Sequence, residues 1–469
     1  MFVYKRIFVL ALCFLSLMGC GTSDLSSVDT GRSSIINAPE SSAEPASNKT
    51  SISDDDPNSD VTSMEVTDQL EKEDESTAIT IGITFSPDNT LVWNLVEAFN
   101  DISDTYQVEL IDYSSAIAVD SPDSAHIELM EKILNSDESP DMVIASHYQT
   151  TYLAGAGLLE DMNQVIDPDT ILPWLWSTVE VNGCNYSLPL GFSFDTVCGK
   201  VDQIGENQNI SVNEFLNLDE NGIPILDEMT NYRFLSALAN ELQHCYVDLE
   251  SRTSSFSSND FVALLEYAAS LPEEVEFTIG NGYEYLRYDT AQVLNISVHD
   301  FQTLHQYETV YVDATLNYTG WPGESGGSIY VLNSVALSKN SENKAGAIEF
   351  LNFLLSDSVQ VLIAETDFPI TASGFDIMCE TAMSVSEGTL IMGGGTTTID
   401  GINYSFTPLT SDEIEKYSHL LQNAHGVYFH DSTIAEFIYK EGTAVFNGQQ
   451  TAEEAASRID TLVASYFEN

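Results

Sequence analysis

Basic residues are scarce in this sequence. The 469 residues include 15 Lys and Arg against 73 Asp and Glu, which gives a formal net charge of −58. A chain this acidic repels nucleic acid and anionic lipid head groups, so we expect no nucleic-acid partner. Only ten basic residues follow Thr77. Pockets for phosphate or carboxylate ligands normally use Arg or Lys, so this scarcity also disfavours an anionic ligand.

Motifs for metals and cofactors are also missing. The cysteines beyond residue 20 form no CxxC pair and show no metal-ligand spacing, and no HExxH or Walker A motif occurs. We therefore predict neither a metal nor a cofactor. In an oxidising compartment these cysteines could form one or two disulfides, and free buried thiols are the alternative. They are Cys184, Cys198, Cys245 and Cys379.

One apolar run stands out, at the N-terminus. Lys5 and Arg6 precede a run from Ile7 to Met18. A membrane-spanning helix needs roughly twenty apolar residues, so this shorter run is typical of a signal peptide. Residues 17–20, Leu-Met-Gly-Cys, resemble the bacterial lipobox. That resemblance implies a signal peptide over residues 1–20 and a lipid on Cys20, which would anchor the chain to the outer side of the cell membrane.

Residues 21–76 differ in composition from the rest of the chain. They are rich in Ser, Thr, Asp and Glu and contain almost no aromatic residues. Such a segment cannot bury a core, so we predict a disordered acidic tether that holds the folded part away from the membrane.

Beyond residue 76 the pattern alternates between strands and helices. Strand-like runs at 79–83, 107–111 and 141–145 are separated by helix-period segments at 91–99 and 125–135. This order predicts an α/β fold with a parallel sheet and right-handed crossovers. Ligands of such sheets bind beyond the carboxyl ends of the strands, here at residues 84–89, 112–114 and 146–148.

A family resemblance runs through most of residues 77–469. It is carried by Ser-Pro-Asp-Met-Val-Ile at 139–144, Leu-Ala-Gly-Ala-Gly-Leu-Leu-Glu-Asp-Met at 153–162, Tyr-Ser-Leu-Pro at 186–189, Gly-Trp-Pro-Gly at 320–323, a strand at 329–338, a helix at 340–356 and the segment 447–455. In this order the segments resemble the extracellular solute-binding proteins (family 1, sugar-binding type) of bacterial ABC importers. Two stretches fit poorly: 202–310, and the glycine-rich 372–409, which we expect to be an insertion or an unusual loop.

The resemblance implies a periplasmic-binding-protein-like type II α/β fold, with two lobes joined by hinge strands around a ligand cleft. Lobe one would comprise 77–189 and 330–366, and lobe two 190–329 and 367–469. It also implies a monomer that captures a solute by hinge closure and delivers it to permease subunits. The scarcity of basic residues and the aromatic–polar loops favour a neutral carbohydrate or oligosaccharide. The same fold with a cationic ligand, such as a polyamine or peptide, is the alternative.

A second alternative is an enzyme. Residues 323–327, Gly-Glu-Ser-Gly-Gly, match G-x-S-x-G, which would make Ser325 the nucleophile of a surface serine hydrolase. Such a serine needs a nearby base and a strand-to-helix turn. The segment leads into a strand instead, and no histidine context of that class precedes it. We therefore favour a glycine-rich hinge and expect no enzyme.

Candidate ligand-binding residues follow from the chemistry of sugars. Sugar rings present apolar faces and hydroxyl edges, so a sugar site combines aromatic platforms with a few polar groups. The strand-end loops, the lobe crossings and the segment before the last two helices offer this mixture. The candidates are Phe85, Asp88, Asn89, Asp112, Ser146, His147, Tyr148, Phe192, Ser193, Trp321, Gly323, Glu324, Ser325, Tyr428 and Asp431.

Several of these residues have a structural alternative. Asp88 and Asn89 can cap a helix, and Phe192 alternates with Phe194 as core residues of a strand do. We expect His147 to donate a hydrogen bond rather than to bind a metal. The tryptophans expected to pack inside the lobes are Trp93, Trp174 and Trp176.

Overall fold

The computed structural model describes residues 76–84, 90–118, 121–218, 222–276, 282–324, 326–384 and 396–468. Residues 76–469 form one compact unit. The predicted signal peptide and tether fall outside the described residues, as do the candidates Cys20, Phe85, Asp88, Asn89 and Ser325.

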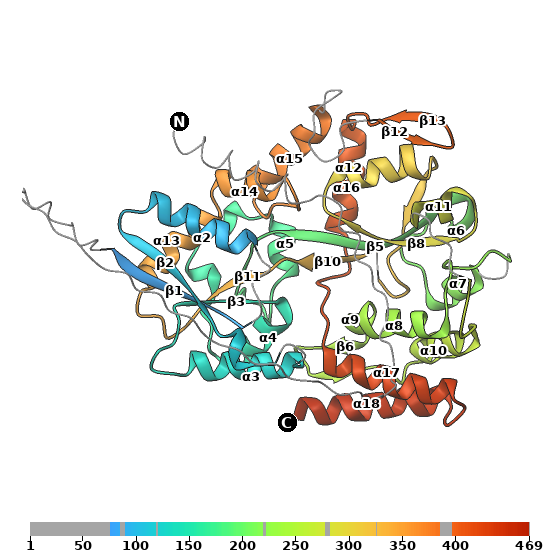
Figure 1. Ribbon diagram of the computed structural model, residues 1–469, viewed down its shortest axis with the longest axis horizontal. Helices are drawn as coiled ribbons and strands as arrows, with labels where there is room; N and C mark the ends of the chain where they lie inside the picture. Colours follow the sequence, from blue (N-terminus) through green and yellow to red (C-terminus); the bar gives the residue numbers. More distant parts are fainter. Residues whose placement is uncertain are drawn as a thin grey trace, which may run out of the picture. The chain divides into compact units, whose positions relative to one another are not determined.

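The first sheet has the predicted βαβαβ order. Strand β1 (Thr77–Ile83) pairs in parallel with β2 (Tyr106–Asp112) and with β3 (Met142–Ala145). The two intervening helices are α2 (Thr90–Ile102) and α3 (Asp123–Leu134). Two antiparallel strands, β11 (Ser334–Leu337) and β4 (Leu188–Pro189), complete the order β2-β1-β3-β11-β4. Figure 1 shows this sheet with α2 and α13 (Lys344–Leu354) above it and α3 below it.

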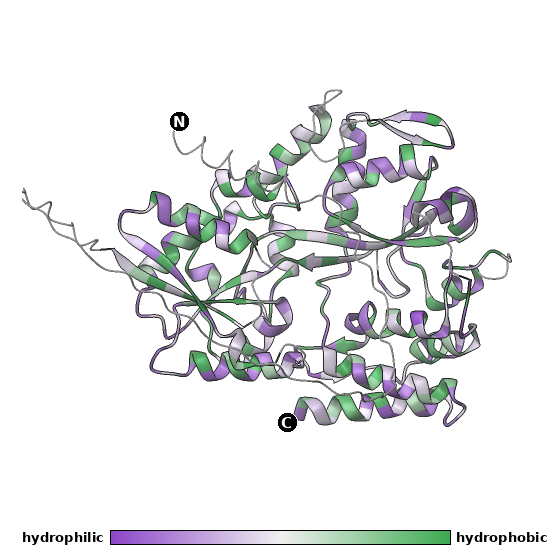
Figure 2. Ribbon diagram, viewed as in Figure 1, coloured by the Kyte–Doolittle hydropathy of each residue, from purple (hydrophilic) through white to green (hydrophobic). Residues whose placement is uncertain are grey.

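Alternating apolar residues hold this sheet to its helices. Ile79 and Ile81 of β1 are fully buried, and Figure 2 shows the strands of the sheet mostly in the hydrophobic colour. Phe99 of α2 meets Phe350 of α13 edge-on, with ring centroids 5.2 Å apart. One prediction for α2 is wrong: Trp93 is 44% exposed. It follows the buried Val92 by one residue, which turns it about 100° away from that position around the helix axis, and it lines the groove between α2 and β2.

The second sheet is antiparallel. Its central strand β5 (Phe192–Lys200) pairs with β10 (Ser328–Val331), β8 (Val293–Val298) and β9 (Leu316–Tyr318). The predicted single strand at 329–338 is therefore two strands that belong to different sheets, β10 and β11. The chain needs this break because it passes there from one sheet to the other.

Two chain crossings lie next to each other between the sheets. One joins β4 to β5, and the other joins β10 to β11. Leu190 N donates to Asn333 O at 3.1 Å, and Leu332 N donates to Gly191 O at 3.0 Å. These reciprocal bonds tie the two crossings into one hinge-like connection.

Helices cover both sheets. Beside the first sheet lie α4 (His147–Gly155), α5 (Pro173–Thr178) and α14 (Asp357–Ile363). The remaining helices are α6 (Val201–Ile204), α7 (Val212–Asn217), α8 (Asn231–Asn240), α9 (Gln243–Tyr246), α10 (Asn259–Ser270), α11 (Gly282–Arg287), α12 (Phe301–Gln306), α15 (Ala372–Ser384), α16 (Ser411–Gln422), α17 (Ser432–Phe446) and α18 (Ala452–Glu468). A hydrophobic cluster of α7, α8, α10, α17 and α18 lies apart from the cluster that fills the two sheets.

The segment 372–409, which we expect to be an insertion or an unusual loop, has regular structure in its described parts. It contains α15 and a hairpin of β12 (Thr396–Ile399) and β13 (Ile402–Ser405). A second small hairpin joins β6 (Val247–Asp248) to β7 (Thr253–Ser254). Residues 385–395, which include the Gly-Gly-Gly run, lie outside the described residues.

Among the described residues, no single helix has the length and apolarity to cross a membrane. The bent pair α13–α14 meets the criterion only when its two parts are joined across a 55° bend. Phe350 and Leu351 of α13 are buried in the core, as in a helix that packs on a sheet. The four described cysteines are all free thiols.

Candidate functional site

A polar face runs across the second sheet next to the crossings. In the register of β10 and β5, Ser328 lies opposite Asp195 and Tyr330 lies opposite Ser193. On the other edge of β5, Ser297 of β8 also lies opposite Asp195. Paired residues of antiparallel strands share one face, so these five side chains lie together. We call this set, Ser193, Asp195, Ser297, Ser328 and Tyr330, the hinge face.

The other side of the same strands is apolar. Phe192, Phe194 and Ile329 alternate with the polar residues and are completely buried. The hinge face, in contrast, is open in part: Tyr330 is 43% exposed, and Asp195 is only partly buried. Packing of the apolar face of β5 and β10 in the core therefore fixes the position of the polar side chains on the hinge face.

The segment between α16 and α17 forms a wall beside the hinge face. His425 N donates to Gly327 O and Tyr428 N donates to Ile329 O, both at 2.8 Å. The ring of Tyr428 lies 5.7 Å from that of Tyr330, and its hydroxyl donates to Asn240 O at 2.8 Å. Two aromatic rings thus stand together at the edge of the face.

A histidine follows β8 at the opposite edge. His299 Nδ1 lies 2.7 Å from Asp367 Oδ1, and its Nε2 lies 3.4 Å from Ser297 Oγ. The hydrogen bond to Asp367 raises the pKa of His299, while burial opposes the rise. This edge therefore carries a cationic group when His299 is protonated.

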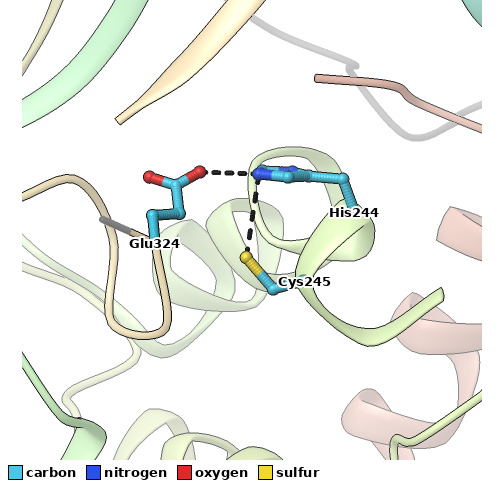
Figure 3. A group of neighbouring side chains, drawn as sticks. All are labelled: His244, Cys245 and Glu324. Carbon is cyan, nitrogen blue, oxygen red and sulfur yellow. Dashed lines mark hydrogen bonds and ion pairs between the residues drawn. The ribbon is translucent and has the colours of Figure 1, made fainter. Parts of the chain in front are cut away.

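A buried ion pair, drawn in Figure 3, borders the hinge face at Ser328. His244 Nε2 of α9 is 2.6 Å from Glu324 Oε1, and Ser328 Oγ donates to the same Oε1 at 2.6 Å. The other oxygen, Oε2, accepts from Trp321 N at 2.7 Å. Burial alone would lower the pKa of His244, but Cys245 and Glu324 together raise it to about 10. His244 is therefore an imidazolium at neutral pH in this arrangement.

Carboxylates gather around this pair. Burial and the negative charge of Glu324 raise the pKa of Asp195. Burial and the charges of Asp195 and Glu324 raise the pKa of Glu241 in the same way. The side chains that converge here are therefore Asp195, Glu241 and Glu324. No bond joins the candidate Asp112 to Glu324 among the described residues: Asp112 Oδ1 accepts from Ser114 N at 2.7 Å at the end of β2.

The candidates Tyr148 and Asp431 meet each other in the interior. Asp431 is fully buried and caps α17 by accepting from Thr433 N and Ile434 N. The hydroxyl of Tyr148, on α4, donates to Asp431 Oδ2. In this structure both side chains connect the helix after β3 to the start of α17, and a role in ligand binding stays a prediction.

Three further candidates are buried among protein neighbours. Phe192 stacks on Phe368 with centroids 5.1 Å apart, which is the core role that its alternation also allowed. Trp321 packs against Phe215 at 6.2 Å. Ser193 is 2% exposed on the hinge face. Any substantial ligand contact of these side chains requires their surroundings to move, because at most 6% of each residue is exposed here.

The segment after β3 forms the N-terminus of helix α4. Ser146 is exposed and forms a capping box with Gln149 at the N-terminus of α4. Burial lowers the pKa of His147, the next residue, to about 4, so its ring is neutral at neutral pH. Gly323 is exposed at φ 101° in the loop before β10.

Ser328 and His244 do not form a catalytic triad. Ser328 Oγ lies 2.8 Å from His244 Nε2, but the carboxylate of Glu324 meets the same nitrogen. A triad needs the acid on the other ring nitrogen, Nδ1. That atom has no hydrogen-bond partner among the described residues.

Sequence reasoning missed Asp195, Glu241, His244 and Tyr330. A signal for part of the site exists: Ser-Phe-Asp at 193–195, Ser-Ile-Tyr at 328–330 and Ser-Val-His at 297–299 are polar–apolar–polar triplets on three strands. Only the strand register shows that these triplets share one face. Nothing in the sequence connects α9 to the loop of Glu324.

Comparison with known proteins identifies the fold. No family model matches the sequence, and no curated protein matches it. Among solved structures, the sugar-binding protein MalE from Xanthomonas citri matches with a TM-score of 0.53 at 14% identity, over 84% of this chain and 98% of that one. A family 1 extracellular solute-binding protein from Alicyclobacillus acidocaldarius gives a TM-score of 0.49 at 15% identity, over 84% and 99%. The MalE match confirms the predicted type of α/β fold, and at this identity it shows the fold alone.

Proposed function

We propose that this chain is the substrate-binding lipoprotein of a bacterial ABC importer and that it captures a neutral carbohydrate or oligosaccharide at the hinge face. The observation that carries the proposal is an exposed aromatic ring, Tyr330, beside the partly buried carboxylate of Asp195, next to the crossings of a MalE-like fold. The compared MalE is described as a sugar-binding protein.

The chemistry of the hinge face suits sugar hydroxyls. A carboxylate such as Asp195 accepts hydrogen bonds from them, and Ser297 can both donate and accept. The rings of Tyr330 and Tyr428 offer surfaces for the apolar face of a pyranose. Arg and Lys are absent from the hinge face, so it lacks the fork or point charge that holds phosphate or carboxylate ligands.

Delivery to a transporter follows from the rest of the proposal. Ligand contacts made on both sides of the crossings would favour a closed arrangement, because a ligand shifts the equilibrium by its differential affinity for the two states. The lipid on Cys20 and the acidic tether would keep the protein beside permease subunits on the outer side of the membrane, where its effective concentration is high.

A ligand screen tests the proposal. We expect neutral oligosaccharides to raise the melting temperature of the full-length chain in a concentration-dependent way. Tyr330→Ala should weaken the binding of the responding sugar by roughly tenfold or more, since about 1.4 kcal/mol corresponds to a factor of ten. Trp93→Ala is the matched control, because Trp93 is exposed to a similar extent, 44%, on the far side of the first sheet.

Other outcomes of the screen would change the proposed ligand or contradict the proposed function. If spermidine or a basic peptide stabilises the chain while sugars have no effect, the face binds a cation, as the gathered carboxylates allow. If ester or peptide turnover is found and Ser325→Ala abolishes it, the chain is a hydrolase. A screen in which no sugar stabilises the chain contradicts carbohydrate capture.

A further inference from the structure

Four possible metal ligands converge beside the hinge face, and one of them, Ser328, belongs to it. His244 and Cys245 are neighbours on α9, and Glu324 lies in the loop before β10 (Figure 3). Around His244 Nε2, Glu324 Oε1 is at 2.6 Å, Ser328 Oγ at 2.8 Å and Cys245 Sγ at 3.7 Å. The ligand atoms of His244, Cys245 and Glu324 all lie within 4.8 Å of one another.

Two of the side chains are protected from solvent, and Cys245 is partly buried. The side chains of His244 and Glu324 are 3% and 2% exposed. His244 Nδ1 has no hydrogen-bond partner among the described residues. The polar contacts of the imidazole ring are therefore made by Nε2. Carbohydrate capture at the hinge face requires neither a thiol nor an imidazole at this depth.

We propose that His244, Cys245 and Glu324 bind a divalent transition-metal cation of the zinc type, with Ser328 or a water completing the coordination. Imidazole, thiolate and carboxylate are the ligand types of zinc sites. A site with one imidazole and one thiolate is poorly suited to Ca²⁺ or Mg²⁺, which prefer six or more oxygen ligands.

The geometry needs only a small local expansion. Tetrahedral zinc with bonds of about 2.0–2.3 Å holds its ligand atoms roughly 3.4 Å apart. The nitrogen–sulfur distance is close to that value, whereas Glu324 must retreat from His244 by less than about 1 Å.

Charge also favours a cation at this point. The carboxylates of Asp195 and Glu241 lie near the pair of His244 and Glu324 and repel one another through space. Metal binding replaces the proton on His244 Nε2 and the thiol proton of Cys245, and both protons leave to solvent. The ion would then fasten the loop of Glu324 to α9 beside the hinge face. This proposal does not depend on what the hinge face binds.

Cobalt substitution gives a direct test. The metal-free full-length chain titrated with Co²⁺ should develop a thiolate-to-cobalt charge-transfer band at one equivalent. Cys245→Ser should abolish that band, and Cys379→Ser, which changes a partly buried thiol on α15, should retain it. Absence of the band in the unmodified chain, or a band that survives Cys245→Ser, overturns the proposal.

Zinc affinity provides an independent measurement. In competition with a chromophoric chelator, His244→Gln should weaken Zn²⁺ binding by more than the roughly 10–100-fold that loss of an outer-shell partner causes. His419→Gln is the control, because His419 is 65% exposed on α16. Circular dichroism of the metal-free variants separates loss of a ligand from loss of the fold. If His244→Gln fails to fold, Glu324→Gln takes its place, and unchanged zinc affinity in a folded variant contradicts the site.

Discussion

At the scale of single residues, Asp195 combines exposure to solvent with an unfavourable charge environment. Burial and the nearby Glu324 raise the pKa of Asp195, while Ser297, His299 and His244 oppose the rise. A carboxyl whose pKa is raised in the folded state is stabilising when protonated. Its contribution is therefore fully present below the unfolded pKa and is lost as the pH rises through the folded pKa.

Asp195→Asn should consequently stabilise the protein at neutral pH. The amide removes the repulsion with Glu324 and is close in size to the carboxyl group, so we expect a rise of roughly 1–2 °C in Tm at pH 7. The gain should shrink as the pH falls and the Asp195 of the unmodified chain becomes protonated. Thermal unfolding at several pH values measures this, and a gain that is independent of pH would contradict the electrostatic cause.

The same substitution should reduce ligand affinity. A hydrogen bond to a charged acceptor contributes about 1.5–3 kcal/mol, so loss of the charge of Asp195 should weaken sugar binding by roughly tenfold or more. Stability and binding would then change in opposite directions at one residue, as is common where a site holds a group under strain.

At the scale of elements, the turn into β10 depends on a close backbone approach. Gly327 has a φ of 141°, and a Cβ placed there would lie 2.4 Å from Asp195 O and 2.8 Å from Phe194 Cζ. The neighbouring Gly323 also has a positive φ, but a Cβ there would meet nothing within 4 Å. The two glycines therefore separate backbone strain from steric conflict.

Gly327→Ala should cost about 2–4 kcal/mol of folding free energy, because overpacking adds to the cost of the backbone conformation. Gly323→Ala should cost about 1 kcal/mol, since only the conformational term applies. Urea unfolding of both variants measures the difference. Equal losses would mean that the strand pair tolerates the added methyl group and that the close approach does not limit β10.

The elements also show what sequence patterns can and cannot predict. Local apolar patterns suffice for β1, α2, β2, α3 and β3, because the two helices carry their buried residues at helical spacing and β3 is a short run of four buried apolar residues. Trp93 shows the limit of this reasoning: its size suggests the core, but its angular position on α2 lies outside the buried stripe. The break at Leu332 and Asn333 has no local signal, because it depends on which sheet each half joins.

The site was less predictable than the fold. The loop containing Glu324 and the segment containing Tyr428 were expected near a ligand, and both border the hinge face. Asp195 was passed over although its neighbour Ser193 was a candidate, since only pairing with β8 and β10 shows which strand face is open. His244 and Cys245 carry no spacing signal, because their partner Glu324 lies far along the chain.

At the scale of the whole molecule, the N-terminal segment and the α/β unit are predicted to have separate tasks. If the lipid on Cys20 serves only as an anchor, its loss should change where the protein is found without changing what it binds. Cys20→Ser should move the protein from the membrane fraction to the medium or to a soluble extracytoplasmic fraction, because the acyl chains are lost and the apolar run from Ile7 to Met18 is shorter than the roughly twenty residues that span a membrane. Cell fractionation with an antibody to the α/β unit measures this, with Cys184→Ser as the control thiol variant.

Sugar-induced stabilisation of the released Cys20→Ser protein should equal that of the anchored form, since the hinge face lies entirely within residues 193–330. Retention of Cys20→Ser in the membrane fraction would show that another part of the chain holds it there.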